Sequence, residues 1–260
     1  MIRVHIVEVI ALIVIFFVTS VVGVVTGGNS LITVPVMLSF GIEPRTAVAT
    51  NMFALTFLSF GGTLPFLGTG TFDRRRLPLL VFLTLIGAVL GALVVLMIPS
   101  KAVPLLISVF MLAVAVFSFL KRDAGVIQKA SPPSQTAELS GYAATFLLGI
   151  YGGFFSGGYV TMLTPIFVVC FSMTFVQAVA NTKLVNIFSS LVATLIFMWY
   201  SLVDYRLGLT LAVTAFLGAI VGARIALKLD NLWLRRIFLT TVVALALKTL
   251  LYDFAWQQLL

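Results

Sequence analysis

The sequence has few charged residues for its length. Only 9% of its 260 residues are charged, whereas a soluble globular domain has about 25%. Hydrophobic residues make up 61% of the chain, and the mean hydropathy is +1.20. This balance excludes an ordinary soluble domain and predicts an integral membrane protein.

Cysteine and histidine occur once each, as Cys170 and His5. A single cysteine excludes a disulfide or a cysteine metal cluster within one chain. A single histidine at the N-terminus excludes a multi-histidine metal site and leaves no catalytic serine, histidine and aspartate set to assemble. We therefore expect no enzyme activity, no cofactor and no metal.

Acidic residues are scarce and stand outside the middle of the apolar runs. The eight of them are Glu8, Glu43, Asp73, Asp123, Glu138, Asp204, Asp230 and Asp253. Because a carboxylate at the membrane centre is the usual carrier of a coupled proton, the sequence does not support proton coupling through a buried acid.

Long apolar runs account for most of the chain. They lie at 9–25, 77–98, 103–120, 139–155, 207–227 and 232–251. Several approach or reach the ~20 residues that cross a bilayer core of ~30 Å. The first run is predicted to be retained, because Glu8 stands at its start and no small-x-small cleavage site precedes the glycines that follow.

The chain is an internal repeat. A shift of 130 residues places Gly23 on Gly153 and Asn51 on Asn181, and the motif VVTGGNSLITVP, 24–35, recurs as GFFSGGYVTMLTP, 153–165. A polar stretch, KRDAGVIQKASPPSQTAE, separates the copies and has the composition of a solvated linker. The predicted organisation is a first membrane repeat at 1–120, a linker at 121–138 and a second membrane repeat at 139–260.

Each repeat contains five apolar segments. They are 7–25, 28–40, 46–68, 77–98 and 102–120, followed by 139–155, 158–171, 175–200, 206–228 and 232–252. The second of each set is too short for a straight crossing and is predicted to be a half-helix. If it returns to the side from which the first segment entered, each repeat crosses three times. The prediction is an all-α polytopic membrane protein built from two inverted repeats.

Basic residues predict the orientation in the membrane. One side would hold Arg74, Arg75, Arg76, Lys121, Arg122, Lys129, Lys228, Arg235 and Arg236, and the other Arg3, Arg45, Lys101 and Arg206. This bias places the linker in the cytoplasm and both termini outside. It also accounts for the net charge of +8 without a nucleic-acid partner.

The glycine pairs interrupt apolar runs where helix is expected. Backbone freed inside the bilayer must be satisfied by protein or must line a watery cavity, and the start of a helix favours an anion. Paired helix starts at mid-membrane occur in many secondary transporters. The candidate contacts are Thr26, Gly27, Gly28 and Asn29 in the first motif, with Ser30 beside them, and Ser156, Gly157 and Gly158 in the second. The alternative is that the glycines only allow close helix packing.

Five further residues complete the candidate site. Pro35 and Pro165 each remove an N–H and are expected to kink the short helices, either for packing or to shape a pathway. Asn51 and Asn181 are predicted to bond to another helix or to a ligand. Lys183 is equivalent by the repeat to Phe53. It would pair with an anionic substrate if buried and would otherwise extend to the membrane–water interface.

The motifs GAVLGA, 87–92, and GAIVGA, 218–223, have the small-xxx-small pattern of tight helix packing. They could hold the two halves together or form the face of a homodimer.

These features together resemble the TauE/SafE-type sulfite exporters, a family of bacterial permeases also described as four-transmembrane sulfite/sulfonate uptake proteins. The resemblance rests on TGGNSLITVP, the asparagine of AVATNMF, the basic FDRRR loop, GAVLGA and their second-half equivalents. It implies a secondary transporter of sulfite, sulfoacetate or other organosulfonates in the bacterial cytoplasmic membrane. Asn29-Ser30 and Tyr159-Val160 follow the glycine pairs, where the glycine-richest members have longer glycine runs.

The expected mechanism is alternating access around an anion held at the two helix starts, with a coupling ion that the sequence does not identify. Two alternatives belong to other classes: a passive anion channel with the same helix starts, and a membrane assembly protein without transport. The expected partners are a small anion and the lipid bilayer.

Overall fold

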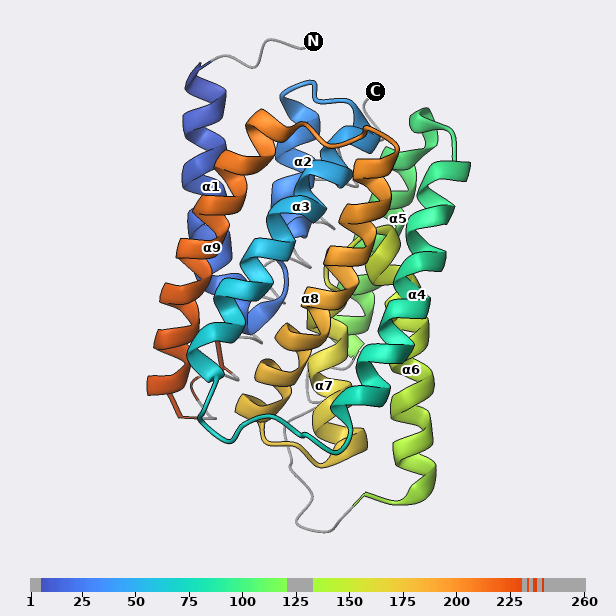
Figure 1. Cartoon of the computed structure of the whole chain (residues 1–260), viewed down its shortest axis with the longest axis vertical. Coiled ribbons are helices and arrows are strands. Elements are labelled where there is room, and N and C mark those ends of the chain that lie inside the picture. The colour runs from blue at the N-terminus through green and yellow to red at the C-terminus, as the bar shows by residue number, and fades with distance from the viewer. Residues whose placement is uncertain (1–5, 121–132, 231–232, 234–235, 238–239, 241–260) are drawn as a thin grey trace.

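A computed structural model of the chain describes residues 6–120 and 133–230 together with residues 233, 236, 237 and 240, and the regular elements in these residues are helices (Figure 1). The long and short helices are α1 (Ile6–Thr26), α2 (Ser30–Ser39), α3 (Pro44–Thr63), α4 (Leu77–Met97), α5 (Val103–Leu120), α6 (Gln135–Phe154), α7 (Tyr159–Phe171), α8 (Phe175–Trp199) and α9 (Tyr205–Lys228). Two 3-10 turns, η1 (Leu64–Phe66) and η2 (Ser100–Ala102), follow α3 and precede α5. The prediction of an all-α membrane fold is confirmed. Most of the predicted segment 232–252 and most of the linker lie outside the described residues.

Capping residues explain where several helices begin. Glu43 accepts a hydrogen bond from the amide of Thr46 at the start of α3, and Pro44 occupies the first turn. At α8, Thr174 and Gln177 form a reciprocal capping box. Asp204 accepts from the first amides of α9. These polar caps mark the ends of the apolar segments.

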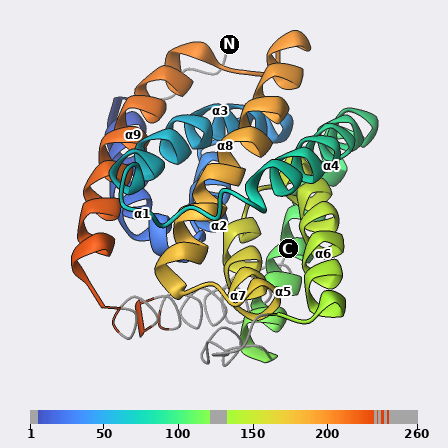
Figure 2. The same cartoon turned by 60° about the horizontal axis from the view of Figure 1, so that its bottom comes forward.

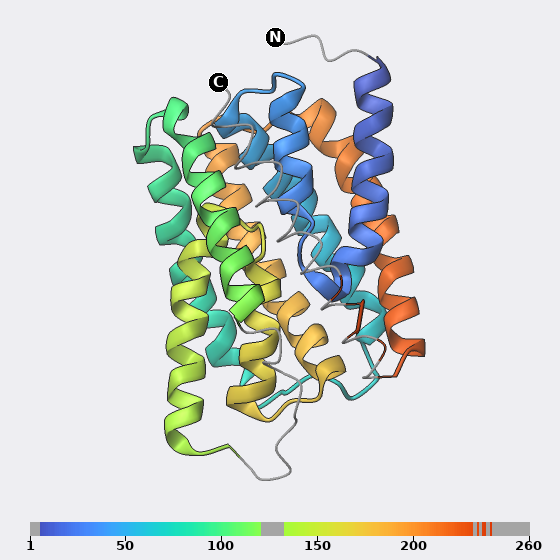
Figure 3. The ribbon, with the colours of Figure 1, turned by 180° about the vertical axis from the view of Figure 1, so that it is seen from behind.

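Five helices are long and apolar enough to cross a membrane: Ile6–Thr26, Pro44–Phe66, Leu77–Met97, Phe175–Trp199 and Tyr205–Lys228. The two helices that follow the glycine pairs have only 10 and 13 residues, or about 15 and 20 Å of rise. This confirms the prediction of short second segments. Figure 3 shows α1 running down to a bend, from which α2 returns towards the end where α1 begins.

The helices form two groups that do not follow the sequence halves. The first contains α1, α2, α3 and α9, and the second contains α4, α5, α6, α7 and α8; α3 and α8 make the main contact between them. Figure 2 shows α1 and α9 on one side, α4 and α6 on the other, and α3 and α8 between. The fourth segment of each half therefore packs with helices of the other half: α4 lies with α6 to α8, and α9 lies with α1 to α3.

Glycines allow the close contacts of α4 with α6 and of α9 with α1. A Cβ at Gly87 of α4 would lie 2.7 Å from the carbonyl oxygen of Phe146 in α6, and one at Gly218 of α9 would lie 2.7 Å from that of Phe17 in α1. Gly91 and Gly222 approach α6 and α1 as closely. Both GAVLGA and GAIVGA thus hold the two halves together within one chain.

The outward surface of the bundle is apolar. Ile10, Phe82, Leu147 and Leu209 are each more than half exposed, although they lie within long helices. A soluble protein seldom exposes such a continuous apolar surface, whereas lipid tails require one.

Candidate functional site

The two helix breaks lie against each other. Gly27 ends α1 with φ +72°, a left-handed conformation that favours glycine. A Cβ at this position would lie 2.6 Å from the amide nitrogen of Thr161 in α7. The Thr161 hydroxyl donates to the carbonyl of Thr26 at 2.5 Å. Residues 135 positions apart in the chain therefore contact each other, and the two helix breaks lie side by side.

Lys183 of α8 binds the end of α1. Its Nζ donates to the carbonyl of Gly23 at 2.7 Å, and the same oxygen accepts from the amide of Gly27 at 2.9 Å. The side chain is 1% exposed, so it does not extend to the interface. The carbonyl end of a helix carries partial negative charge, which favours a cation there. Lys183 is the one charged residue among the buried residues of the described chain.

Side-chain amides organise the first break. Asn29 donates to the hydroxyls of Thr19 at 3.0 Å and Ser20 at 3.2 Å, both on α1. Asn51 of α3 donates to Ser30 at 2.9 Å and accepts from Thr33 at 2.7 Å, both on α2. Asn51 therefore ties the short helix to α3, as predicted for an asparagine that bonds to another helix.

A cavity of about 130 Å³ lies beside the first break. Three of the predicted contacts, Thr26, Gly28 and Asn29, line it, and its other walls are Val18, Thr19, Val22 and Ile32. The Thr26 hydroxyl donates to the carbonyl of Val22, so carbon atoms dominate the lining.

The second break has different surroundings. Gly158 has φ +80°, and a Cβ there would lie 2.5 Å from Cγ1 of Val114 in α5. Gly157 packs against Phe155 and Leu31. The Ser156 carbonyl accepts from the amide of Tyr159 at 3.1 Å. The two breaks share a sequence motif, but side-chain amides bond to hydroxyls at the first, whereas the second packs against Val114, Phe155 and Leu31 and has its Gly157 carbonyl accept from the Tyr151 hydroxyl.

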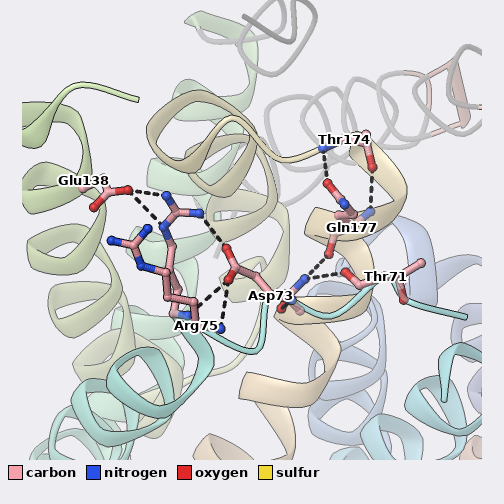
Figure 4. Close-up of polar contacts among 8 residues, drawn as sticks. Thr71, Asp73, Arg75, Glu138, Thr174 and Gln177 are labelled. Carbon is pink, nitrogen blue, oxygen red and sulfur yellow. Dashed lines mark hydrogen bonds and ion pairs between the residues drawn. The ribbon is translucent and has the colours of Figure 1, made fainter. Parts of the chain in front are cut away.

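Asn181 forms hydrogen bonds in the N-terminal part of α8. Its amide donates to the carbonyls of Gln177 at 2.7 Å and Thr71 at 3.1 Å and accepts from the amide of Asp73 at 3.1 Å (Figure 4). In the other repeat Thr50, next to Asn51, accepts from the amide of Asp204 at 3.0 Å. Asn181 therefore anchors the loop before α4, and its contact with substrate stays a prediction.

Arg76 forms the ion pairs nearest this loop. Its guanidinium donates to Asp73 Oδ2 at 2.6 Å and to Glu138 of α6 (Figure 4). It also lies 5.4 Å from the ring centre of Phe171. Burial lowers the pKa of Arg76, but its hydrogen bonds to Glu138 and Asp73 outweigh this and raise the pKa above its ordinary value. The pairs join the loop to α6 and α7 at one end of the bundle.

Sequence reasoning missed a polar seam between α3 and α8. The Asn186 amide donates to the hydroxyl of Ser59 at 2.7 Å, and Thr56 shares a hydrogen bond of 3.2 Å with Thr194. Within the described residues, Asn186 Oδ1 and Ser189 Oγ are buried without a hydrogen-bond partner. A signal was available, because the shift of 130 places Ser59 on Ser189.

Pro35 and Pro165 lie inside α2 and α7, as predicted. Pro165 is buried, four residues beyond Thr161, whose hydroxyl contacts the first break. A role for either proline in a pathway stays a prediction.

Comparison with known proteins agrees with a membrane transporter. The family model described as "Sulfite exporter TauE/SafE" matches residues 11–249. The chain is 28% identical over 238 residues to the probable membrane transporter protein ORF9 of a Sinorhizobium species, covering 90% of this chain and 89% of that protein. It is 25% identical over 256 residues to the probable membrane transporter protein YfcA of Escherichia coli strain K12, covering 95% and 92%. It is 23% identical over 243 residues to the probable membrane transporter protein YunE of Bacillus subtilis strain 168, covering 85% and 89%. No solved structure matches the chain.

Proposed function

The chain belongs to the sulfite exporter TauE/SafE family of membrane transporters, and we propose that it is a secondary transporter of sulfur-containing anions in the bacterial cytoplasmic membrane. The proposed substrates are sulfite, sulfoacetate or other organosulfonates. The multi-pass helical fold and the membrane transporters among its relatives support a transporter rather than an enzyme.

The observation that carries the anion proposal is the burial of Lys183 at the first break. A lone cation inside a bilayer is costly unless a counter-charge or polar groups compensate it. No described acidic residue forms a salt bridge with Lys183, and its ammonium donates to the Gly23 carbonyl. Two of the three ammonium hydrogens are thus left for other acceptors. An anion is the partner that would neutralise the charge.

The proposed mechanism is alternating access. The moving bodies would be the two helix groups, α1–α2–α3–α9 and α4 to α8, rather than the two halves of the sequence. The α3–α8 contact and the touching breaks lie between these groups. Rocking there would expose Lys183 first to one side and then to the other.

The basic residues support the predicted orientation of this transporter. Arg74, Arg75 and Arg76 lie in the loop before α4 and Lys228 ends α9, and Figure 1 has both of these regions at the lower end of the bundle. By the positive-inside rule that end would face the cytoplasm.

The test is counterflow in proteoliposomes. Vesicles loaded with unlabelled sulfite or sulfoacetate should take up the labelled anion, and chloride should not compete. Lys183→Met should lower the rate at least tenfold, because it removes the buried cation. Lys228→Met is the matched control, since that lysine is exposed at the end of α9.

Normal transport by Lys183→Met would remove the lysine from the mechanism. A flux far above about 10³ per second, faster than domain rocking permits, would indicate a channel. Absence of exchange with every sulfur anion, in protein shown to be folded, would refute the proposed substrate class.

A further inference from the structure

Two unpaired polar atoms stand out in the buried part of the bundle. Asn186 and Ser189 of α8 are 2% and 1% exposed, yet Asn186 Oδ1 and Ser189 Oγ have no hydrogen-bond partner. Native structures pair most buried polar groups, since an unpaired one forfeits its hydration. The other unpaired atom in the described chain, Arg45 Nε, lies on a different helix, in the first turn of α3. Of the two atoms on α8, Ser189 Oγ can donate to an acceptor that enters the bundle, whereas Asn186 Oδ1 can only accept.

These atoms lie along the helix that carries the buried lysine. Lys183, Asn186 and Ser189 follow one another at intervals of three residues, so neighbours in this series are close on the helix surface. Asn186 donates to Ser59 of α3 at 2.7 Å. One turn further along α3, a Cβ at Gly62 would lie 3.6 Å from Cδ of Lys183. The glycine leaves room for the lysine chain beside the polar seam.

The seam offers hydrogen-bond donors to an oxyanion. Ser59 Oγ accepts from Asn186, which leaves the Ser59 hydrogen to be donated, and Ser189 carries a second hydroxyl. The ammonium of Lys183 adds donors beyond the one used by Gly23. Neutral hydroxyls with one cation suit an SO₃ head group.

We infer that the anion head group binds in the α3–α8 seam beside Lys183, where the hydroxyls of Ser59 and Ser189 and the second side-chain N–H of Asn186 would donate to it, and that this site accepts one negative charge. The inference rests on the proposed function and deepens it. Monoanions such as alkyl sulfonates and hydrogen sulfite bind there in preference to dianions such as sulfate. Among the proposed substrates, the site therefore favours hydrogen sulfite and singly charged organosulfonates over sulfoacetate, which carries two negative charges.

The number of buried charges explains why the site would prefer monoanions. Lys183 is the only charged residue that the described chain buries. The guanidinium of Arg76, the cation in the described salt bridges, is already paired with two carboxylates, those of Asp73 and Glu138. A second negative charge on the ligand would remain uncompensated in a low-dielectric site, which is strongly unfavourable.

The position of the seam also fits transport. The α3–α8 contact joins the two helix groups, and Figure 2 shows α3 and α8 in the centre of the bundle. A ligand held there touches both groups, so its binding responds to their relative movement.

The experiment compares methanesulfonate with sulfate, which share a sulfur–oxygen head group but differ in charge. We expect methanesulfonate to compete for counterflow, and to raise the thermal stability of the purified protein, at concentrations at least tenfold below those of sulfate. Ser189→Ala should weaken methanesulfonate binding about tenfold, as expected for a hydrogen bond to a charged group. It should leave the unliganded stability unchanged, because that hydroxyl has no protein partner to lose.

Thr194→Val is the matched control. It removes a buried hydroxyl from the same helix, but one that pairs with Thr56, so it should lower stability and leave affinity unchanged. Ser59→Ala should weaken binding as Ser189→Ala does.

Three results would overturn the inference. Equal or tighter binding of sulfate would refute the charge count while the proposed function stands. Unchanged methanesulfonate affinity in both serine variants would refute the seam as the site. Failure of either anion to bind or exchange, in folded protein that also ignores sulfite and sulfoacetate, would refute the proposed function and the inference with it.

Discussion

The contact between the two helix breaks can be tested with a matched pair of glycine substitutions. Gly27 and Gly41 have nearly the same backbone conformation, with φ +72° and +75°. An alanine Cβ at Gly41 would meet nothing within 4 Å, whereas one at Gly27 would lie 2.6 Å from the Thr161 amide nitrogen. Gly41→Ala should therefore cost only the left-handed conformation, roughly 1–2 kcal/mol. Gly27→Ala adds an overpacking cost of about 1–3 kcal/mol, for a total of about 2–5 kcal/mol.

The assay is equilibrium unfolding of both variants in mixed detergent and SDS micelles, followed by helix content. The free energy of unfolding should fall about twice as far for Gly27→Ala as for Gly41→Ala. Transport should fall in Gly27→Ala alone, because Gly41 lies in the turn between α2 and α3, away from both breaks. Equal losses of stability and equal transport rates in the two variants would refute the close contact between the breaks.

Three further predictions test other contacts. Lys183→Arg should retain part of the transport that Lys183→Met loses, because arginine keeps the charge but not the shape of the ammonium; equal rates in the two variants, measured by counterflow, would argue against a charge requirement. Gly158→Ala should destabilise the fold by about 2–5 kcal/mol, as estimated for Gly27→Ala, and Val114→Ala in the same chain should recover the part due to overpacking, since Cγ1 of Val114 is the atom met at 2.5 Å. A double-mutant cycle on Arg76→Met and Glu138→Leu should give a coupling energy of about 1 kcal/mol for this partly exposed pair, and a coupling of zero by SDS unfolding would show that the pair contributes nothing.

The packing of α4 on α6 and of α9 on α1 limits which parts of such a transporter could move as rigid bodies. If the sequence halves were the rigid bodies, α4 would have to separate from α6 and α9 from α1. Both contacts are glycine-lined and among the tightest in the bundle, so separating them would forfeit much close packing. The α3–α8 contact, with polar side chains across it, is the better place for relative movement.

Local features of the sequence determined the class of protein and the list of its segments. Hydropathy over windows of about 20 residues identifies membrane helices because lipid itself selects for apolar side chains. The glycine pairs predicted the interruptions near Gly27 and Gly158, and the length of each run predicted that α2 and α7 would be short. Each of these properties depends on neighbouring residues, so the sequence contains it directly.

Tertiary packing decided what each copy of a repeated motif does. Asn51 and Asn181 are equivalent in sequence, but Asn51 binds α2 and Asn181 binds the loop before α4. Gly28 borders a cavity, whereas Gly158 is packed against Val114. Their partners come from segments more than 40 positions away in several cases, and no local pattern specifies which distant side chain will arrive.

The same limit explains the residues that sequence reasoning missed. Lys183 was predicted as a site residue, but its partner was not, because the hydrogen bond to the Gly23 carbonyl spans 160 positions. Ser59, Asn186 and Ser189 are ordinary polar residues on helices α3 and α8 and gain significance only when the two helices meet and leave two of their atoms unpaired. Composition and periodicity therefore determined which segments enter the membrane, and helix packing decided which polar groups face one another inside it, because burial and pairing are properties of the assembled bundle.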